Sequence, residues 1–205
     1  MKKELMLIDP LLTVEEIIQS TSTAKEGGYA SICILPLMAR HVYPLLEGTD
    51  IKLSTVIGFP FGHMPVEAKL SEIVLAMVDG VEIFSVIINL PALLHNDWQY
   101  LAGELNAIMP VLASKNKTLR IVIEAGLLSE DQLMKCCDLY GIAGIHVLES
   151  HTGFYYPAPG NKALEQMRSF LTDQVLLKTN IRVENDNFDL STLPVYIGQV
   201  GITTV

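Results

Sequence analysis

The sequence has few of the features that mark secreted, membrane-spanning or nucleic-acid-binding proteins. Its three cysteines, Cys33, Cys136 and Cys137, lack the paired spacing of a zinc site. An odd number of cysteines without an export signal predicts reduced thiols and a cytoplasmic protein. No apolar run reaches the roughly 18 residues of a membrane span. The net charge is −9, which argues against the basic surface that nucleic acid or anionic lipid requires.

Apolar residues are abundant instead. They make up 50% of the 205 residues, and the mean hydropathy is +0.36. A parallel sheet that is buried on both faces gives such a composition, because its strands are nearly continuous apolar runs. The length suits one domain with a large core, so we expect residues 1–205 to form a single domain.

Segments with the composition of strands alternate with amphipathic helical segments along the whole chain. The helical segments carry apolar residues at spacings of three and four, and Ser129 with Gln132 forms a capping pattern before one of them. The predicted strands span residues 5–9, 29–36, 52–60, 81–89, 118–126, 144–150, 174–180 and 195–201.

This alternation in a short chain predicts the α/β class, as a compact TIM (β/α)8 barrel. The segment 183–194 is too polar and too short for a full helix, so we expect a shortened seventh helical segment. We also expect no final helix after the eighth strand. The outer face of that strand would then need a cover, either from the N-terminal residues or from another subunit, and we expect a homodimer or higher homo-oligomer.

A specific pattern follows the third predicted strand. Its residues are Gly58, Phe59, Pro60, Gly62, Glu67 and Lys69. The pattern resembles the deoxyribose-phosphate aldolase family, and residues 30–36, 80–94, 119–133 and 144–154 are similar to that family as well. The resemblance implies a TIM barrel and the reversible aldol cleavage of 2-deoxyribose 5-phosphate, the reaction of a class I aldolase (an aldehyde-lyase). It also implies that no metal and no cofactor takes part.

The catalytic positions that the resemblance implies are partly substituted. The Schiff-base lysine of the sixth strand falls on Glu149, and the aspartate of the fourth strand falls on Ser85. A carboxylate forms no imine, and an unactivated serine does not carry protons near neutral pH. The lysine of the seventh strand remains as Lys178, and His151 follows Glu149 at a distance of two residues.

The substrate-binding positions show the same mixture. Thr152 and Gly153 keep the turn after the sixth strand, and Gly198 and Gly201 remain in the eighth. The two glycines that normally follow the seventh strand are missing. Arg182 stands beside this gap and could bind a phosphate in their place, because arginine binds phosphate bidentately. The alternative is a surface arginine on a short helix.

Several alternatives stay open for the charged residues. Lys178 could form a Schiff base, or it could pair with Glu149 and remain charged. His151 could carry a proton or be a solvated turn residue. Glu149, His151, Glu124 and Asp9 could converge on a divalent cation, although the resemblance implies none.

Three functions follow from these alternatives. The first is a catalytically impaired or repurposed barrel that binds a small sugar phosphate or carbonyl compound at its carboxyl-terminal face. The second is an active aldehyde-lyase with Lys178 as the Schiff-base residue. The third is a structural or regulatory partner protein without catalysis.

Overall fold

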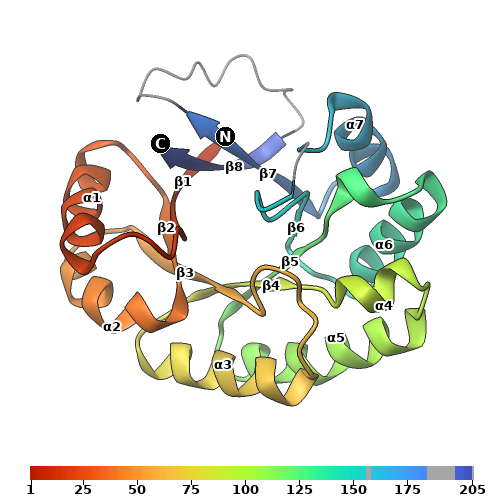
Figure 1. Ribbon diagram of the computed structural model, residues 1–205, viewed down its shortest axis with the longest axis horizontal. Coiled ribbons are helices and arrows are strands. Elements are labelled where there is room, and N and C mark those ends of the chain that lie inside the picture. The colour runs from red at the N-terminus through yellow and green to blue at the C-terminus, as the bar shows by residue number, and fades with distance from the viewer. Residues whose placement is uncertain (156–157, 184–196, 205) are drawn as a thin grey trace.

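The computed structural model describes residues 1–155, 158–183 and 197–204. Within them, eight parallel strands close into a barrel in chain order, and β8 pairs with β1. Figure 1 shows the strands at the centre and the helices around them. The strands are β1 (Lys2–Leu7), β2 (Ser31–Ile34), β3 (Lys52–Ile57), β4 (Ile83–Ile87), β5 (Thr118–Val122), β6 (Val147–Glu149), β7 (Leu176–Val183) and β8 (Ile197–Thr204). The predicted TIM barrel is confirmed.

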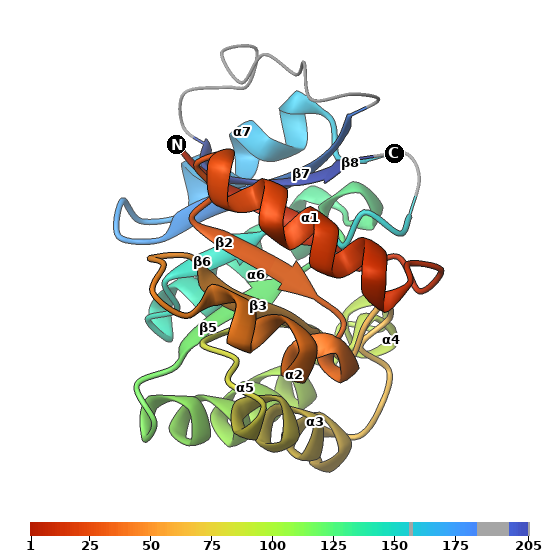
Figure 2. The same ribbon diagram turned by 90° about the vertical axis from the view of Figure 1, so that its left-hand side faces the viewer.

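Helices cover the outside of this barrel, and Figure 2 shows α1 and α2 lying over β2 and β3. The α-helices are α1 (Val14–Glu26), α2 (Ala39–Val42), α3 (Val66–Val78), α4 (Leu90–Leu94), α5 (Trp98–Ala113), α6 (Glu130–Ile142) and α7 (Asn161–Phe170). Short 3-10 turns are η1 (Pro36–Met38), η2 (Tyr43–Leu46) and η3 (Ala125–Leu127). The predicted short seventh helical segment falls almost wholly on residues 184–196, outside the described residues.

Two helices begin with capping boxes, one of which the sequence predicts. The Ser129 hydroxyl accepts from the Gln132 N–H, and the Gln132 side chain accepts from the Ser129 N–H, which forms the predicted capping box of α6. Thr13 and Glu16 form the same arrangement at α1. Of the helices in the described ranges, none is long and apolar enough to cross a membrane.

The strand register decides which side chains point into the barrel. Because side chains alternate along a strand and paired residues face the same side, one set of positions fills the interior. A polar layer of that interior contains Glu4, Ser31, Ser85, Arg120, Glu149 and Lys178. Above it lies an apolar layer of Met6, Cys33, Val56, Ile87 and Val122, which packs apart from the main core between strands and helices.

The side chain of a buried lysine, Lys69, lies beside Gly58 in the β3–α3 turn. Gly58 and Gly62 both have left-handed backbone conformations, at φ 71° and 61°, which glycine adopts without steric cost. Lys69 of α3 is fully buried and donates to the Ile87 carbonyl at 2.6 Å and to Glu104 at 2.7 Å. These contacts fix the turn, and the turn places Phe59 at the carboxyl-terminal end of the barrel.

The last two strands depart from the sequence-based expectation. β7 continues to Val183, so Arg182 lies on a strand, and the alternative of an arginine on a short helix is wrong. The outer face of β8 is not bare, because Val200 and Ile202 are buried and pack with Tyr29 and Ile181. Of the two expected covers, residues of the same chain therefore lie over this strand, and it gives no separate argument for a second subunit.

Candidate active site

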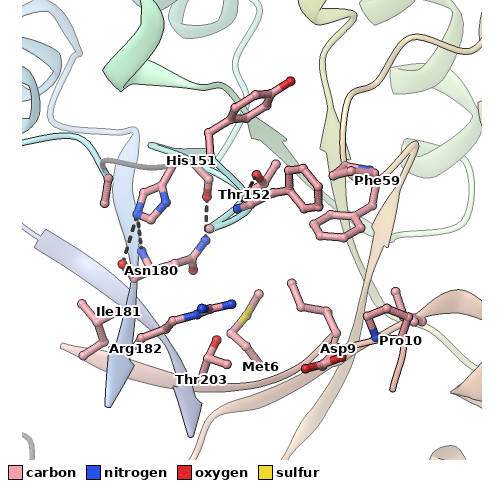
Figure 3. Close-up of a pocket in the computed structure, with 17 residues that line it drawn as sticks. Met6, Asp9, Pro10, Phe59, His151, Thr152, Asn180, Ile181, Arg182 and Thr203 are labelled. Carbon is pink, nitrogen blue, oxygen red and sulfur yellow. Dashed lines mark hydrogen bonds between the residues drawn. The ribbon is translucent and has the colours of Figure 1, made fainter. Parts of the chain in front are cut away.

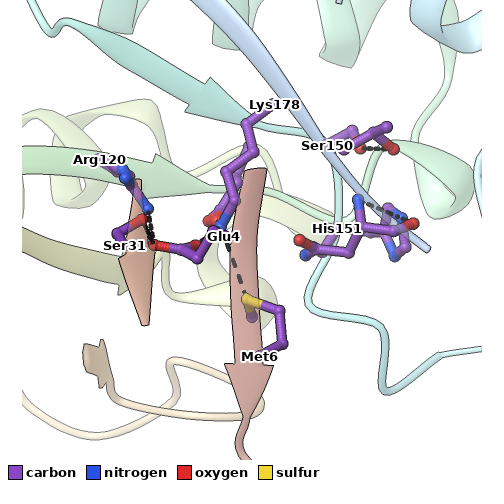
Figure 4. Close-up of polar contacts among 10 residues, drawn as sticks. Glu4, Met6, Ser31, Arg120, Ser150, His151 and Lys178 are labelled. Atoms are coloured by element: carbon purple, nitrogen blue, oxygen red, sulfur yellow. Dashed lines mark hydrogen bonds and ion pairs between the residues drawn. The ribbon is translucent and has the colours of Figure 1, made fainter. Parts of the chain in front are cut away.

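A buried ionic network fills the polar layer of the barrel. The Lys178 ammonium forms ion pairs with both Glu149 and Glu4, and its side chain is fully buried. Glu4 also accepts from Arg120 at 2.7 Å and from the Ser31 hydroxyl at 2.7 Å. Figure 4 shows Lys178 reaching from β7 toward Glu4 on β1. Two acids and two bases thus neutralise one another in the centre of the fold.

The network keeps Lys178 and Glu4 charged. Burial by itself lowers the pKa of Lys178, but Glu149 and then Glu4 outweigh that effect and leave its pKa raised. Burial would likewise raise the pKa of Glu4, but Arg120 and Lys178 together hold it well below its usual range. Lys178 is therefore an ammonium near neutral pH. An ammonium has no lone pair with which to attack a carbonyl carbon.

Ser85 gains no activating base in this environment. Its side chain is 1% exposed, it pairs in register with Arg120, and its hydroxyl has no hydrogen-bond partner within the described residues. A hydroxyl with no adjacent base keeps its proton. Ser85 therefore lines the polar interior of the barrel and has no group that would let it transfer a proton.

Met6 separates the ionic network from a cavity at the carboxyl-terminal end of the barrel. The Lys178 ammonium lies 3.9 Å from the Met6 sulfur, and Met6 lines the cavity. This cavity has a volume of about 760 Å³ and opens among the ends of β1, β3, β6, β7 and β8 (Figure 3). Lys178, Glu149 and Ser85 are absent from its lining. The cavity therefore ends above Lys178, Glu149 and Ser85.

His151 and Asn180 form one wall of the cavity. Nε2 of His151 lies 3.0 Å from the Asn180 carbonyl oxygen and 3.4 Å from the Asn180 N–H, and the Asn180 amide donates to the His151 carbonyl at 2.6 Å. Burial lowers the pKa of His151 to about 4, so the imidazole is neutral at pH 7. His151 Nδ1 and Asn180 Oδ1 have no partner among the described residues. The alternative of a solvated turn histidine is wrong, because His151 is only 3% exposed.

Glu124 holds the adjoining turn. Its carboxylate accepts from the Thr152 hydroxyl and, at 3.0 Å, from the Thr152 N–H. The Thr152 hydroxyl in turn accepts from the Phe154 N–H at 3.1 Å, and Gly153 between them has a left-handed φ of 82°. Glu124 thus positions the turn that carries Phe154 over the cavity.

The predicted site residues therefore separate into three places. His151, Thr152, Gly153 and Arg182 line the cavity. Lys178, Glu149 and Ser85 lie below it in the barrel interior. The two glycines of β8 do not belong to the lining. A β-carbon at Gly198 would lie 3.0 Å from the Leu176 side chain, and one at Gly201 would collide with the side chains of Asn180 and Met6.

The alternative of a metal site finds no support in these positions. Glu149 faces Lys178, and Glu124 is occupied by Thr152. Across residues 1–155, 158–183 and 197–204, no group of three or more His, Cys, Asp and Glu side chains could hold a metal ion.

Sequence reasoning missed Glu4 and Arg120. Arg120 is the only charged residue of β5, in "TLRIV", and Glu4 stands directly before the apolar run "LMLI" of β1, after Lys2 and Lys3. A charge in such a strand is rarely left unpaired, because an isolated buried charge is very costly. Two such residues of opposite sign are therefore a signal for an ion pair across the barrel, although the sequence does not show that Lys178 shares it.

Comparison with known proteins gives a consistent result. No family model matches the chain. A deoxyribose-phosphate aldolase of Clostridium botulinum is 34% identical over 148 residues, which is 72% of this chain and 69% of the relative. The chain belongs to the deoxyribose-phosphate aldolase family. A family member from Caldanaerobacter subterraneus is 30% identical over 163 residues, or 79% of this chain and 69% of the relative.

Solved structures support the fold of this deoxyribose-phosphate aldolase family member. The aldolase QR15 superposes with a TM-score of 0.84 at 20% identity, and the superposition covers 98% of this chain and 89% of the QR15 chain. The deoxyribose phosphate aldolase from Aeropyrum pernix gives a TM-score of 0.79 at 22% identity, covering 87% of this chain and 75% of its own. The family scaffold therefore surrounds an interior that contains Glu149, Ser85 and Lys178.

Proposed function

We propose that this protein is a repurposed or catalytically impaired barrel of the deoxyribose-phosphate aldolase family, which binds a small phosphorylated or carbonyl compound at the carboxyl-terminal face. The observation that carries the proposal is the state of Lys178. Its ammonium is fully buried, pairs with Glu149 and Glu4, and lies beneath Met6 rather than in the cavity. Imine formation requires a neutral amine in contact with the carbonyl compound.

The cavity supports the binding part of the proposal. Its volume of about 760 Å³ lies within the range of small-molecule sites. Its lining combines apolar side chains with a few polar groups, among them His151 and Arg182. Its place at the carboxyl-terminal ends of the strands is where TIM barrels bind their ligands.

A second candidate is an active aldehyde-lyase. The names of the relatives favour it, because those from Clostridium botulinum and Caldanaerobacter subterraneus are called deoxyribose-phosphate aldolases. In this case Lys178 would form the imine after losing a proton to Glu149, and Met6 would move to admit the substrate. Aldol cleavage would then release glyceraldehyde 3-phosphate and acetaldehyde.

Borohydride trapping separates the two candidates. The protein is incubated with 2-deoxyribose 5-phosphate or acetaldehyde, reduced with borohydride, and examined by intact and peptide mass spectrometry. The proposal expects no adduct on Lys178 and no cleavage of 2-deoxyribose 5-phosphate. A stoichiometric adduct on Lys178 that disappears in K178M would establish the second candidate instead. Trapping on the exposed Lys135 serves as the control for nonspecific modification.

We also propose that the protein is a cytoplasmic homo-oligomer. The three cysteines are unpaired and buried, which suits a reducing compartment. The related enzyme from Aeropyrum pernix is described as a tetramer. Light scattering coupled to size-exclusion chromatography tests this proposal, and a mass equal to the 22.6 kDa of one chain would contradict it.

A further inference from the structure

The two sides of the cavity differ sharply in chemistry. One side is built by aromatic residues from the turns after β3 and β6, and includes Phe59 and Phe154. The opposite side is built by β7 and β8, and carries Asn180, Arg182 and Thr203. Figure 3 shows Arg182 reaching from β7 toward Met6, across the cavity from Phe59. A ligand that fills the cavity therefore meets apolar rings at one end and a cation at the other.

The aromatic side is a connected cluster. The Phe154 ring packs edge-on against Phe59, with centroids 6.4 Å apart, and against Phe61 at 5.2 Å. Tyr155 lies 5.8 Å from both Phe61 and Phe154. Edge-to-face contacts of this kind favour a further ring or flat apolar group. Sugar hydroxyls would meet no hydrogen-bonding atoms on the ring faces, and burying an unpaired hydroxyl costs binding energy.

Arg182 supplies the charged end. Its side chain is exposed to the cavity and forms no hydrogen bond or ion pair with the part of the chain that the structure describes. Asp9 also lines the cavity, but its carboxylate accepts from the Leu11 N–H at 2.9 Å and makes no ion pair with Arg182. A guanidinium without a protein partner can bind an oxyanion through two parallel hydrogen bonds.

From this polarity we infer that the cavity takes an oxyanion with a flat apolar body, such as an aryl phosphate or aryl carboxylate, in preference to a sugar phosphate. The inference rests on the proposed function, since it assigns a ligand class to the same cavity. In this arrangement the oxyanion pairs with Arg182 near Thr203. The apolar body lies against Phe59 and Phe154, above Met6.

Two probes with the same headgroup test the inference. Phenyl phosphate and 2-deoxyribose 5-phosphate are titrated into the full chain by isothermal calorimetry, with benzyl alcohol and inorganic phosphate as probes of each end alone. We expect phenyl phosphate to bind about tenfold tighter than 2-deoxyribose 5-phosphate, a difference of about 1.4 kcal/mol. Benzyl alcohol and inorganic phosphate should each bind more weakly than phenyl phosphate.

Variants then assign the two ends of the ligand. R182Q should weaken phenyl phosphate about tenfold, whereas R40Q, an exposed arginine of α2 outside the cavity, should leave it unchanged. F154A should weaken phenyl phosphate while leaving inorganic phosphate unaffected. Phe154 is 56% exposed, so its truncation leaves the core intact.

The outcomes separate this inference from the proposed function. If 2-deoxyribose 5-phosphate binds as tightly as phenyl phosphate or more tightly, the ligand class is wrong while the proposed binding function stands. If R182Q leaves phenyl phosphate binding unchanged, the assigned charged end is wrong. If none of the probes binds, both the inference and the proposed binding function are overturned.

Discussion

Replacing Lys178 by methionine tests the ionic network most directly. The interior holds Glu4 and Glu149 against Arg120 and Lys178, so the four charges sum to zero. K178M keeps most of the side-chain volume but leaves one negative charge without a partner inside the barrel. Removing one member of a buried ion pair costs about 3–5 kcal/mol. In a domain of this size each kcal/mol lowers Tm by about 2–4 °C, so we expect a fall of about 6–20 °C.

Urea unfolding at pH 7, followed by circular dichroism, measures this loss. The matched control is K135M, because Lys135 pairs with Asp131 at 2.9 Å on the surface, where the two side chains are 47% and 62% exposed. An exposed pair of this kind contributes less than about 0.5 kcal/mol. The double variant K178M/E149M restores a neutral interior and should recover much of the loss, because hydrophobic replacement of a whole buried pair is often neutral.

The reasoning fails if K178M lowers the free energy of unfolding by less than about 1 kcal/mol, because removing a charged lysine from between two buried carboxylates should cost more. It also fails if K178M/E149M is less stable than K178M. In either case the ion pairs of Lys178 would not explain the stability of the interior, and the main objection to imine chemistry at this residue would weaken.

Three further predictions follow. G62A places a β-carbon against the Ile88 carbonyl and should cost about 1–3 kcal/mol more than G48A, whose φ is also left-handed (74°) but whose surroundings are open. Burial lowers the pKa of His151 to about 4, so the neutral imidazole stabilises the fold fully above about pH 6.5, and this stabilisation is lost as the pH falls toward 4. H151Q should therefore lose less free energy of unfolding between pH 7 and 5 than the unmodified protein, and an equal loss would contradict this. E149K puts a third cation beside one carboxylate, so it should lower Tm and show no cleavage of 2-deoxyribose 5-phosphate.

Most of the architecture could be predicted from the sequence. Eight apolar segments that alternate with amphipathic ones are sufficient for a closed parallel barrel, because each strand must be buried on both faces. The Ser129–Gln132 cap and the glycines at 58 and 62 depend only on local backbone requirements, and the structure has them as expected. The predicted boundaries of β7 were wrong. The residues after Lys178 are partly polar and do not look like a buried strand, but they continue β7 and pair with β8.

The candidate site was only partly predictable. Thr152, Gly153 and His151 were placed at the cavity because strand ends meet at one face of a barrel. The directions of the Lys178 and Glu149 side chains could not be predicted, because an inward side chain can point into a cavity or toward a partner across the barrel. Glu4 lies 174 residues from Lys178 in the sequence (178 − 4), and no local pattern reports a pair so distant.

The sequence by itself determined the barrel and the presence of a carboxylate instead of an amine at position 149, because apolar periodicity and residue identity are local properties. Only the tertiary structure decided that Lys178 is charged and lies beneath Met6, because its protonation depends on Glu149 and Glu4, which closure of the barrel brings to it. Charge and access are properties of the surroundings of an amine, and folding assembles those surroundings from strands far apart in the chain.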